Sequence, residues 1–505
     1  MFKPVSKNPI LWTDGYKLCH KDQYPALTSW VYETWTPRMS RIAGVKHVVF
    51  YGLQGALAEM THAFATYFFG QPLAQVVAEY EEAIAEVFAG TNPNFAQTHS
   101  SEHIAALHNL GYLPIKIKAL PEGTMVPIGV PMFTIENTHP EFFWLPGYLE
   151  TQLSSYIWLP MTSATIADQY KRLLTSYAKR TSDPMKVINQ CGDFSMRGMG
   201  SPEAAQRSAG GHLLSFSGSA TLSVREYLKA YYGATKNVMS YTPSTEHSVM
   251  CSYGEQEVEA FKHLITTVYP SGNISIVSDT YDLWNVVDHV LPQLKELILQ
   301  RDGKVIIRPD SGDPTLILCG DKEATSPTVA KGIVQRLYEI FGGVVNEKGF
   351  IELDPHIGVV YGDSITVDRA NSICNGLMEK GFATTNAILG IGSYTYQYVT
   401  RDTFGFALKG TAEIIDGRFK AIQKRPATDT GNFKKSQRGM VAVVFEENEY
   451  KLIDDLNPER AKELKDQDLL CDFYIDGEFV YTHNFEEIRA RVLTESNRIY
   501  ETESK

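Results

Sequence analysis

The chain has 505 residues and a formal net charge of −12, from 47 Lys and Arg against 59 Asp and Glu. That length suffices for about three average domains or two larger ones, and the diffuse acidity argues against nucleic acid as the main partner, because phosphate backbones bind basic surface. Six cysteines lie far apart with no Cys-x-x-Cys pair, so neither a zinc site nor a disulfide framework is indicated, and a reducing compartment fits best.

The sequence gives no sign of a membrane segment. No run of 18 apolar residues occurs, and the first residues, Met1–Pro4, form no apolar signal core. We therefore expect a cytoplasmic protein without a membrane partner. The acidic net charge does not exclude small anions as ligands, because a few local arginines can bind them.

The first part of the chain carries β-rich sequence between residues 113 and 137. Ile115–Lys118 and Met132–Ile135 contain β-branched or aromatic residues, and Pro and Gly lie between the two runs. Such runs predict strands.

The middle of the chain, from about residue 185 to 395, alternates short apolar runs with amphipathic helical patterns. The expected strands are Ile274–Val277, Val305–Ile307, Ile357–Val360 and Ala387–Leu389. One expected helix spans residues 258–268 and another spans 329–341, each with its apolar residues on one face. Runs of β-branched residues are typical of buried parallel strands. Repeated strand–helix units of about thirty residues predict a parallel sheet, open or closed into a barrel.

After about residue 400 the pattern changes to hairpins. Ile414–Phe419 and Tyr474–Phe479 each place Asp-Gly between two strand-like runs, which is a strong hairpin signal. We therefore predict a second domain built from both ends of the chain. The expected divisions are 1–150 and 396–505 for its two parts, with 151–395 as the catalytic domain.

Polar or glycine-rich sequence follows each of the four predicted parallel strands. These segments are Ser278–Asp282, Arg308–Asp313, Tyr361–Ser364 and Gly390–Ser393. A single polar segment of this kind could equally be a helix cap and would not indicate a site. Four in succession predict a shared site, because the carboxyl ends of parallel strands meet at one mouth of a barrel or one edge of a sheet.

The residue types at these strand ends suit a phosphorylated sugar. Arg308 and Arg401 can pair with anionic oxygens, and the turns at Gly362 and Gly390–Ser393 let backbone N–H groups approach a phosphate. Magnesium prefers oxygen ligands and is often shared with phosphates. Its candidate ligands are Asp279, Asp310, Asp313 and Asp363.

Two further segments add an aromatic plane and a nucleophile. Gly192–Gly198 contains Phe194, which can stack on a flat heteroaromatic ring, and Arg197, which can serve an anion. Pro243–Ser248 sets His247 among small hydroxyls, and imidazole suits a nitrogen nucleophile near neutral pH. A lone histidine at a helix start is more often a cap neighbour. Together these residues predict an enzyme that handles a phosphorylated sugar and an aromatic base.

These residues belong to ordered motifs that resemble the nicotinamide phosphoribosyltransferase family nearly end to end. The matching segments are Thr13–Lys17, Tyr51–Gln54, Gly192–Phe194, Arg197–Gly198, Glu246–Ser248, Ser278–Asp279, Ile307–Gly312, Gly362–Asp363 and Thr400–Asp402. The resemblance implies an irregular parallel α/β barrel of the type II phosphoribosyltransferase kind, with a β-rich α+β domain formed from both chain ends. It also implies an enzyme of NAD salvage that makes nicotinamide mononucleotide and pyrophosphate from nicotinamide and phosphoribosyl pyrophosphate.

The resemblance further implies individual roles. ATP, as a co-substrate, phosphorylates His247, which Asp279 orients, with Glu246 as the third catalytic residue. The residues implied at the base are Phe194, Tyr16, Arg308 and Ala220. Those implied at the phosphoribosyl and phosphate groups are Arg197, Asp310, Gly362, Asp363, Gly392, Ser393, Arg401, Arg38, Lys409 and Lys434. Mg2+ is implied at Asp310, Asp279 and Asp363, partly through water. Tyr16 comes from the second subunit of a head-to-tail homodimer with shared active sites.

The sequence departs from the family's pattern at two places. Ala220 stands where the family normally has an aspartate, which accepts a hydrogen bond from the nicotinamide amide and disfavours the nicotinate carboxylate. Losing both effects weakens discrimination between the bases, by about tenfold to a hundredfold for a hydrogen bond of roughly 1.5–3 kcal/mol. Tyr394 follows Ser393 where the family continues a glycine run, which predicts a narrower phosphate loop.

Two main alternatives stay open. A nicotinate phosphoribosyltransferase shares the fold and the phosphohistidine; Ala220 favours it, whereas Glu246–Ser248 favours the nicotinamide branch. A catalytically silent relative that binds nucleotides or partners is the second, and intact His247, Asp279 and Arg308 argue against it. An unrelated phosphate-binding barrel would leave most of the motifs unexplained.

Overall fold

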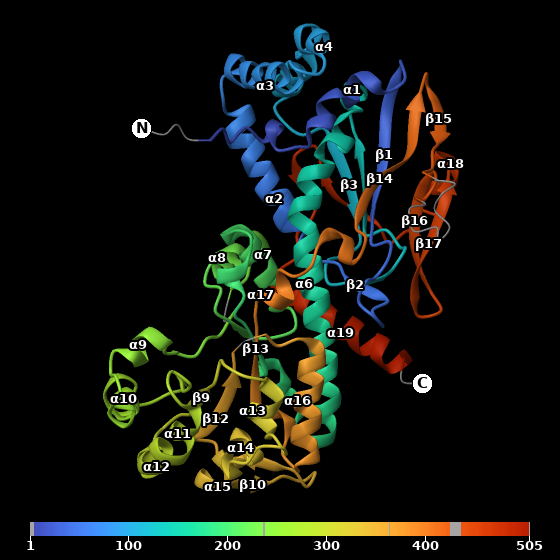
Figure 1. Ribbon diagram of the computed structural model, residues 1–505. Helices are drawn as coiled ribbons and strands as arrows, with labels where there is room; N and C mark the ends of the chain where they lie inside the picture. Colours follow the sequence, from blue (N-terminus) through green and yellow to red (C-terminus); the bar gives the residue numbers. More distant parts are fainter. Residues whose placement is uncertain (1–4, 236–237, 363, 425–435, 504–505) are drawn as a thin grey trace. The chain divides into compact units, whose positions relative to one another are not determined.

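The computed structural model describes residues 5–235, 238–362, 364–424 and 436–503, and the chain divides into two compact units (Figure 1). Unit 1 takes its residues from the chain up to Thr162, from Lys229–Ala234 and from Thr400–Glu495. Unit 2 comprises Ser163–Leu228, Thr235–Val399 and the chain from Ser496 onward. The long helix α6 (Leu145–Thr181) crosses the first boundary, whereas the sequence placed that boundary at residue 150 and the later one at 395.

Unit 1 is built on a seven-stranded antiparallel sheet that joins both ends of the chain. Its strands in order are β15 (Arg418–Ala421), β14 (Ala407–Ile415), β1 (Thr28–Thr36), β5 (Phe133–Asn137), β3 (Ile115–Ala119), β18 (Cys471–Ile475) and β19 (Glu478–Phe479). The N-terminal strand β1 pairs with the C-terminal strand β14, and β3 pairs with β18. The predicted β-rich domain from both chain ends is therefore confirmed.

The two predicted hairpins are present at the edges of this sheet. In the β14–β15 turn, Asp416 and Gly417 have φ of 50° and 67°, and in the β18–β19 turn Asp476 and Gly477 have φ of 49° and 91°. Positive φ at both central residues is the turn whose twist matches that of paired strands, which is why Asp-Gly stands there.

Aromatic packing holds the two chain ends of unit 1 together. The buried ring of Trp35 in β1 stacks on Phe133 at 5.9 Å and on Phe406 at 5.5 Å between ring centroids. The remaining elements are two β pairs and a set of helices. The pairs are β2 (His47–Val49) with β4 (Met125–Pro127) and β16 (Met440–Glu446) with β17 (Glu449–Leu456). The helices are α1 (His20–Gln23), α2 (Leu53–Phe64), α3 (Leu73–Phe88), α4 (Pro93–Thr98), α5 (Glu102–Leu110), α18 (Pro458–Glu463) and α19 (Phe485–Glu503).

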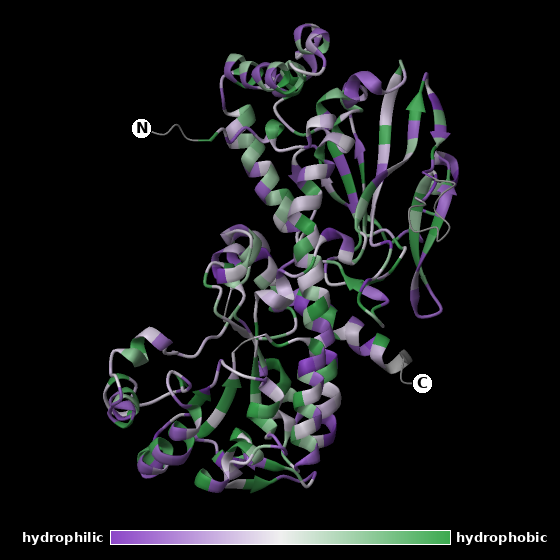
Figure 2. Cartoon of the chain, viewed as in Figure 1, coloured by the Kyte–Doolittle hydropathy of each residue, from purple (hydrophilic) through white to green (hydrophobic). Residues whose placement is uncertain are grey.

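Unit 2 contains the predicted parallel sheet. Its six strands in order are β7 (Gly218–Ser219), β6 (Cys191–Asp193), β13 (Ala387–Ile391), β12 (Ile357–Tyr361), β9 (Val305–Arg308) and β8 (Ile274–Val277). Every neighbouring pair is parallel, and all residues of β8 and β12 are buried. Figure 2 shows green, apolar residues along β9 and β12, as parallel strands buried on both faces require.

Helices follow the strands of unit 2 in the expected alternation (Figure 1). They are α7 (Pro202–His212), α8 (Val224–Tyr232), α9 (His247–Cys251), α10 (Glu257–His263), α11 (Leu283–Asn285), α12 (Leu291–Leu299), α13 (Pro314–Cys319), α14 (Pro327–Lys331), α15 (Ile333–Phe341), α16 (Val367–Glu379) and α17 (Ser393–Tyr396), with a short β pair of β10 (Gly343–Val345) and β11 (Ile351–Leu353). The single helix expected over 329–341 is wrong: Gly332 adopts a φ of 76°, outside the helical range, and separates α14 from α15. Within the described part of the chain, none of the helices is both long and apolar enough to cross a membrane.

Candidate active site

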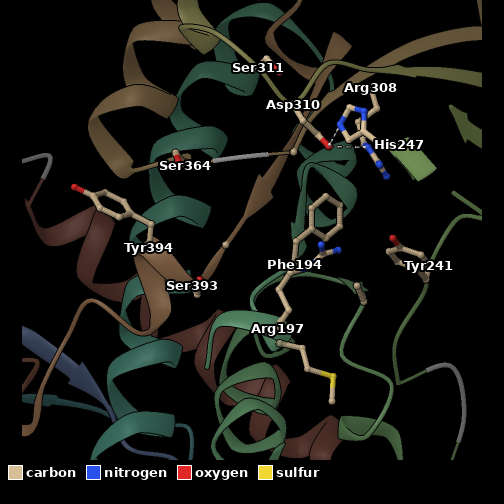
Figure 3. Close-up of a pocket in the computed structure, with 14 residues that line it drawn as sticks. Phe194, Arg197, Tyr241, His247, Arg308, Asp310, Ser311, Ser364, Ser393 and Tyr394 are labelled. Carbon is tan, nitrogen blue, oxygen red and sulfur yellow. Dashed lines mark ion pairs between the residues drawn. The ribbon is translucent and has the colours of Figure 1, made fainter. Parts of the chain in front are cut away.

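A pocket of about 860 Å³ opens at the carboxyl ends of the parallel strands of unit 2 (Figure 3). It is lined by Phe194, Met196, Arg197, Ala220, Tyr241, His247, Arg308, Asp310, Ser311, Gly362, Ser364, Gly392, Ser393 and Tyr394. Residues that follow β6, β9, β12 and β13 thus meet in one cavity, as expected where parallel strands share an edge.

The edge strand of the sheet fixes the segment that carries His247. The N–H of Thr245 donates to the carbonyl of Ser275 over 3.0 Å, and the N–H of Ser275 donates to the carbonyl of Pro243 over 2.9 Å. The hydroxyl of Thr245 also accepts from the N–H of Val277 at 2.9 Å. Because these bonds anchor the segment to β8, His247 begins helix α9 at the mouth of the pocket.

The imidazole of His247 lies between a hydroxyl and two carboxylates. Its Nδ1 atom is 3.1 Å from Oγ1 of Thr280, and its Nε2 atom is 3.8 Å from Asp279 and 3.9 Å from Asp310. The side chain is 47% exposed. A histidine with this exposure can meet a phosphate donor from solvent.

Asp279 makes two kinds of contact in this geometry. Its Oδ2 atom accepts from the N–H groups of Asp310 and Ser311 at 2.9 and 2.8 Å, which braces the turn after β9. Its Oδ1 atom faces His247. By contrast, the carboxylate of Asp313 accepts from the N–H groups at the start of α13 and is not among the pocket-lining residues, so this suggested magnesium ligand is a helix cap.

Two arginines bring positive charge to the pocket. Arg308, at the end of β9, donates from Nη2 to the carbonyl of Thr245 over 2.9 Å, and its Nε atom lies 3.5 Å from Asp310. Arg197 follows β6 and is exposed to the cavity. In Figure 3, Arg308, Asp310 and His247 lie together on one side of the pocket, with Ser393 and Tyr394 on the other.

The ring of Phe194 lies in the pocket between these two groups. Its N–H donates to the carbonyl of Ile391 over 2.9 Å, which holds the end of β6 against β13. Tyr241 meets the Phe194 ring edge-on, with centroids 6.2 Å apart and planes at 80°. Ala220 lines the same cavity. This region is an aromatic slot, defined here by Phe194, Tyr241 and Ala220, and it suits a flat heteroaromatic ring.

Among the described residues, the others implied by the family resemblance lie in unit 1 or are not part of the pocket lining. Tyr16 is 56% exposed and lines a separate cavity of about 220 Å³ together with Arg401. Lys409 pairs with Glu150 at 2.9 Å, and Nε of Arg38 donates to the carbonyl of Gly405 over 2.8 Å. The carboxylate of Glu246 accepts from the hydroxyl of Ser248. Asp363 and Lys434 lie outside the described residues.

Glu150 connects two cations beside Tyr16. Its carboxylate meets Lys17 at 2.6 Å as well as Lys409. Burial raises the pKa of Glu150, but Lys409 and Lys17 outweigh that effect and hold the pKa below its ordinary value. Glu150 therefore stays ionised and fixes both lysine side chains.

Sequence reasoning assigned no role to several residues that the structure brings to the site. Met196, Tyr241 and Ser364 line the pocket, and Thr280 contacts His247. Tyr241 stands six residues before His247, and Thr280 follows Asp279 directly. Proximity to a predicted site residue was the available signal for both.

Comparisons with known proteins match both units. The nicotinate phosphoribosyltransferase (NAPRTase) family model matches residues 189–476, and the model of the nicotinamide phosphoribosyltransferase N-terminal domain matches residues 8–117. The chain belongs to this phosphoribosyltransferase family. The nicotinamide phosphoribosyltransferase of Acinetobacter baylyi is 44% identical over 96% of this chain and 97% of the relative. The one from Xanthomonas campestris pv. campestris is 33% identical over 96% and 97%.

Two solved structures share the fold of this chain. A nicotinate-nucleotide pyrophosphorylase from Pyrococcus furiosus aligns with a TM-score of 0.60 and 15% identity, over 99% of this chain and 98% of that protein. Human nicotinic acid phosphoribosyltransferase aligns with a TM-score of 0.54 and 16% identity, over 96% and 94%. At such identities the match speaks for the fold alone. It confirms the predicted type II phosphoribosyltransferase architecture with an added β-rich domain.

Proposed function

We propose that this chain transfers the 5-phosphoribosyl group of phosphoribosyl pyrophosphate to the ring nitrogen of nicotinamide, in NAD salvage. The observation that carries this proposal is the pocket of unit 2, which places the Phe194 ring, two arginines and His247 around one cavity. Membership of the family and relatives named nicotinamide phosphoribosyltransferase support the same reaction. All six cysteines are unpaired, which supports a cytoplasmic location.

The reaction requires that the ring nitrogen be positioned at the anomeric carbon and that the charge of the leaving pyrophosphate be stabilised. It does not require proton transfer. The lone pair of the pyridine nitrogen forms a bond to the anomeric carbon, while the bond from that carbon to the pyrophosphate oxygen breaks and its electrons leave with pyrophosphate. Stacking on Phe194 orients the ring, with Arg308 at the ring's edge, and Arg197 stabilises negative charge on the phosphates. No general base is needed, because the attacking nitrogen carries no proton.

ATP is proposed as a co-substrate that phosphorylates His247. The histidine is half exposed at the pocket and is held by Thr280 and Asp279. Nucleophilic attack breaks the bond between the β- and γ-phosphates, so ADP leaves and a phosphohistidine forms. Glu246 is proposed to act beside it through its contact with Ser248.

Magnesium is proposed as the cation of the phosphate region. The described residues hold no group of three or more His, Cys, Asp and Glu side chains arranged for a metal, but Asp279 and Asp310 lie beside the cavity. Two carboxylates fit an ion that takes its other ligands from water and substrate phosphates. When bound, it supplies positive charge to the pyrophosphate oxygens.

A homodimer with shared active sites is proposed from the family resemblance of Tyr16. That side chain is exposed beside Arg401 in unit 1 and suits the second wall of a base slot. Arg38, Arg401 and Lys409 are proposed to serve phosphates there. A fully active monomer in sedimentation would contradict this part of the proposal.

The test is product formation from phosphoribosyl pyrophosphate, magnesium and either nicotinamide or nicotinate, with and without ATP. Nicotinamide mononucleotide in amounts raised by ATP is expected. Ala220 in the slot favours a second candidate, a nicotinate phosphoribosyltransferase, and product from nicotinate alone would establish it. Absence of product from both bases would contradict the transferase and leave a silent relative.

A further inference from the structure

The carboxylate of Asp193 is buried completely and ties two segments together. Its Oδ1 atom accepts from the N–H and the hydroxyl of Ser195 at 3.0 and 2.6 Å. Its Oδ2 atom accepts from the hydroxyls of Ser219 and Thr221 at 2.9 and 2.7 Å. Four donors share this one buried carboxylate. Disrupting the arrangement is strongly unfavourable, because each buried donor left unpaired adds its desolvation free energy.

The two segments are the walls of the aromatic slot. Phe194 lies between Asp193 and Ser195, and Ala220 lies between Ser219 and Thr221. The N–H of Ala220 also donates to the carbonyl of Asp193 over 2.8 Å. Strands β6 and β7 are paired at Asp193 and Ser219. The separation of Phe194 from Ala220 is therefore set by this backbone pairing together with the Asp193 side chain, which does not itself line the pocket.

The same bonds decide which polar groups the wall offers to a ligand. Ser219 and Thr221 are buried and direct their hydroxyl protons to Asp193. Their segment thus presents the methyl group of Ala220 to the cavity, while Arg197 and Arg308 supply charge elsewhere on its lining. An arginine attracts the carbonyl of an amide and, more strongly, a carboxylate.

We propose that Asp193 is a positioning residue for the base: it fixes the width of the aromatic slot and keeps two hydroxyls turned away from the bound ring. The inference rests on the proposed transfer to a pyridine base and names the residue that determines how that base is held. Asp193 is distinct from the groups that bind phosphoribosyl pyrophosphate, because its side-chain hydrogen bonds within the described part of the chain reach only the two walls of the slot.

The experiment compares the full-length wild type with Asp193→Asn, Ser219→Ala and Thr221→Val. Equilibrium dialysis with labelled nicotinamide and nicotinate gives Kd for each base, and steady-state kinetics give KM for both substrates. In Asp193→Asn the amide donates where the carboxylate accepted, so at least one hydroxyl must turn its proton elsewhere. We expect Kd and KM for the base to rise about tenfold, with KM for phosphoribosyl pyrophosphate nearly unchanged, and the ratio of the two base affinities to shift. The single-hydroxyl variants should fall between Asp193→Asn and the wild type.

Asp168→Asn is the matched control, because Asp168 is a buried carboxylate of unit 2 that pairs with Arg172 at 2.6 Å on helix α6. It should lower thermal stability without moving the base affinities. Base affinities unchanged in all folded slot variants, or shifted equally by Asp168→Asn, would overturn the role of Asp193. If Asp193→Asn does not fold, the base affinities of Ser219→Ala and Thr221→Val test the role of Asp193 in its place.

The wild type separates this inference from the proposed function. Wild-type protein that binds a base but forms no product contradicts the transferase reaction, and the comparison of Kd values still tests Asp193. Wild-type protein that binds neither base overturns both, because no base is then held in the slot.

Discussion

The Nδ1 atom of His247 lies 3.1 Å from the hydroxyl oxygen of Thr280, while Nε2 on the far side of the ring faces Asp279 at 3.8 Å. Carboxylates near Nε2 favour a proton on that nitrogen, and the Thr280 hydroxyl can then donate to Nδ1. The imidazole is thus held from both sides. Its orientation depends on Thr280 as well as on the acid that the sequence indicated.

Removing the imidazole should uncouple ATP from transfer. For His247→Ala we expect ATP hydrolysis and ATP stimulation to be lost, while slow ATP-independent transfer remains, because the pyridine nitrogen attacks without the histidine. Thr280→Val should slow phosphohistidine formation by about tenfold, as expected for a lost positioning bond. Phosphohistidine formation from labelled ATP and product formation are the measurements. His263→Ala, an exposed histidine on α10, is the control; equal loss in that variant would contradict the assignment.

Much of the fold follows from local pattern. The strand β8 spans the predicted Ile274–Val277, and β9, β12 and β13 begin at the predicted residues, because buried parallel strands require continuous apolar runs. The Asp-Gly turns predicted their hairpins for a similarly local reason. The break at Gly332 was missed, since helical periodicity continues across it and only the backbone conformation ends the helix.

The candidate site was less predictable than the strands that carry it. Strand ends indicated Arg308, Gly362 and Gly392 because topology brings carboxyl ends together. The sequence places Asp193 directly before Phe194, but no local pattern shows that its carboxylate reaches Ser219 and Thr221. Contacts between segments distant in sequence require the structure.

The Phe194 ring leaves no room for a side chain at position 390. A Cβ atom at Gly390 would lie 2.6 Å from Cδ2 of Phe194 and 2.9 Å from Cα of Gly362. Because Gly390 lies within β13 and Gly362 directly follows β12, neither backbone can easily move, and Gly390→Ala should displace the ring. We expect the KM for the base to rise about tenfold or more, measured by steady-state kinetics with saturating phosphoribosyl pyrophosphate. Gly90→Ala has open space around its Cβ and serves as the control. An unchanged KM for the base in Gly390→Ala would contradict the assigned position of the base on Phe194.

Ala220 predicts weak discrimination between nicotinamide and nicotinate. Restoring a carboxylate with Ala220→Asp should favour nicotinamide by about tenfold to a hundredfold, through one hydrogen bond to the amide and repulsion of the nicotinate carboxylate. The ratio of kcat/KM for the two bases is the measurement. Ala220→Asn supplies an acceptor without charge and separates the two effects. A wild type that already prefers nicotinamide more than about a thousandfold would contradict the argument, because no discriminating charge stands at this position.

Glu33 gives the stability of unit 1 a pH dependence. Its side chain is buried beside Glu150, and burial first, then that neighbouring carboxylate, raise its pKa from 4.5 to about 7, against the opposing effect of Lys17 and Lys409. The pKa of Glu33 is thus higher in the folded protein than in the unfolded chain. Its protonation therefore contributes stability that is fully present below about pH 4.5 and is lost as the pH rises through about 7.

Replacing Glu33 with an amide should remove this dependence. Glu33→Gln stays neutral at every pH, so its free energy of unfolding relative to the wild type should increase between pH 4.5 and 7 and level off above, by on the order of 3 kcal/mol in total. Thermal unfolding across this range by calorimetry measures the difference. Glu459→Gln, at an exposed carboxylate of α18, should show no such trend. If the free energies of unfolding of Glu33→Gln and the wild type differ by a constant amount between pH 4.5 and 7, Glu33 is ionised in the folded protein over this whole range. The effect of Lys17 and Lys409 on its pKa would then outweigh that of burial.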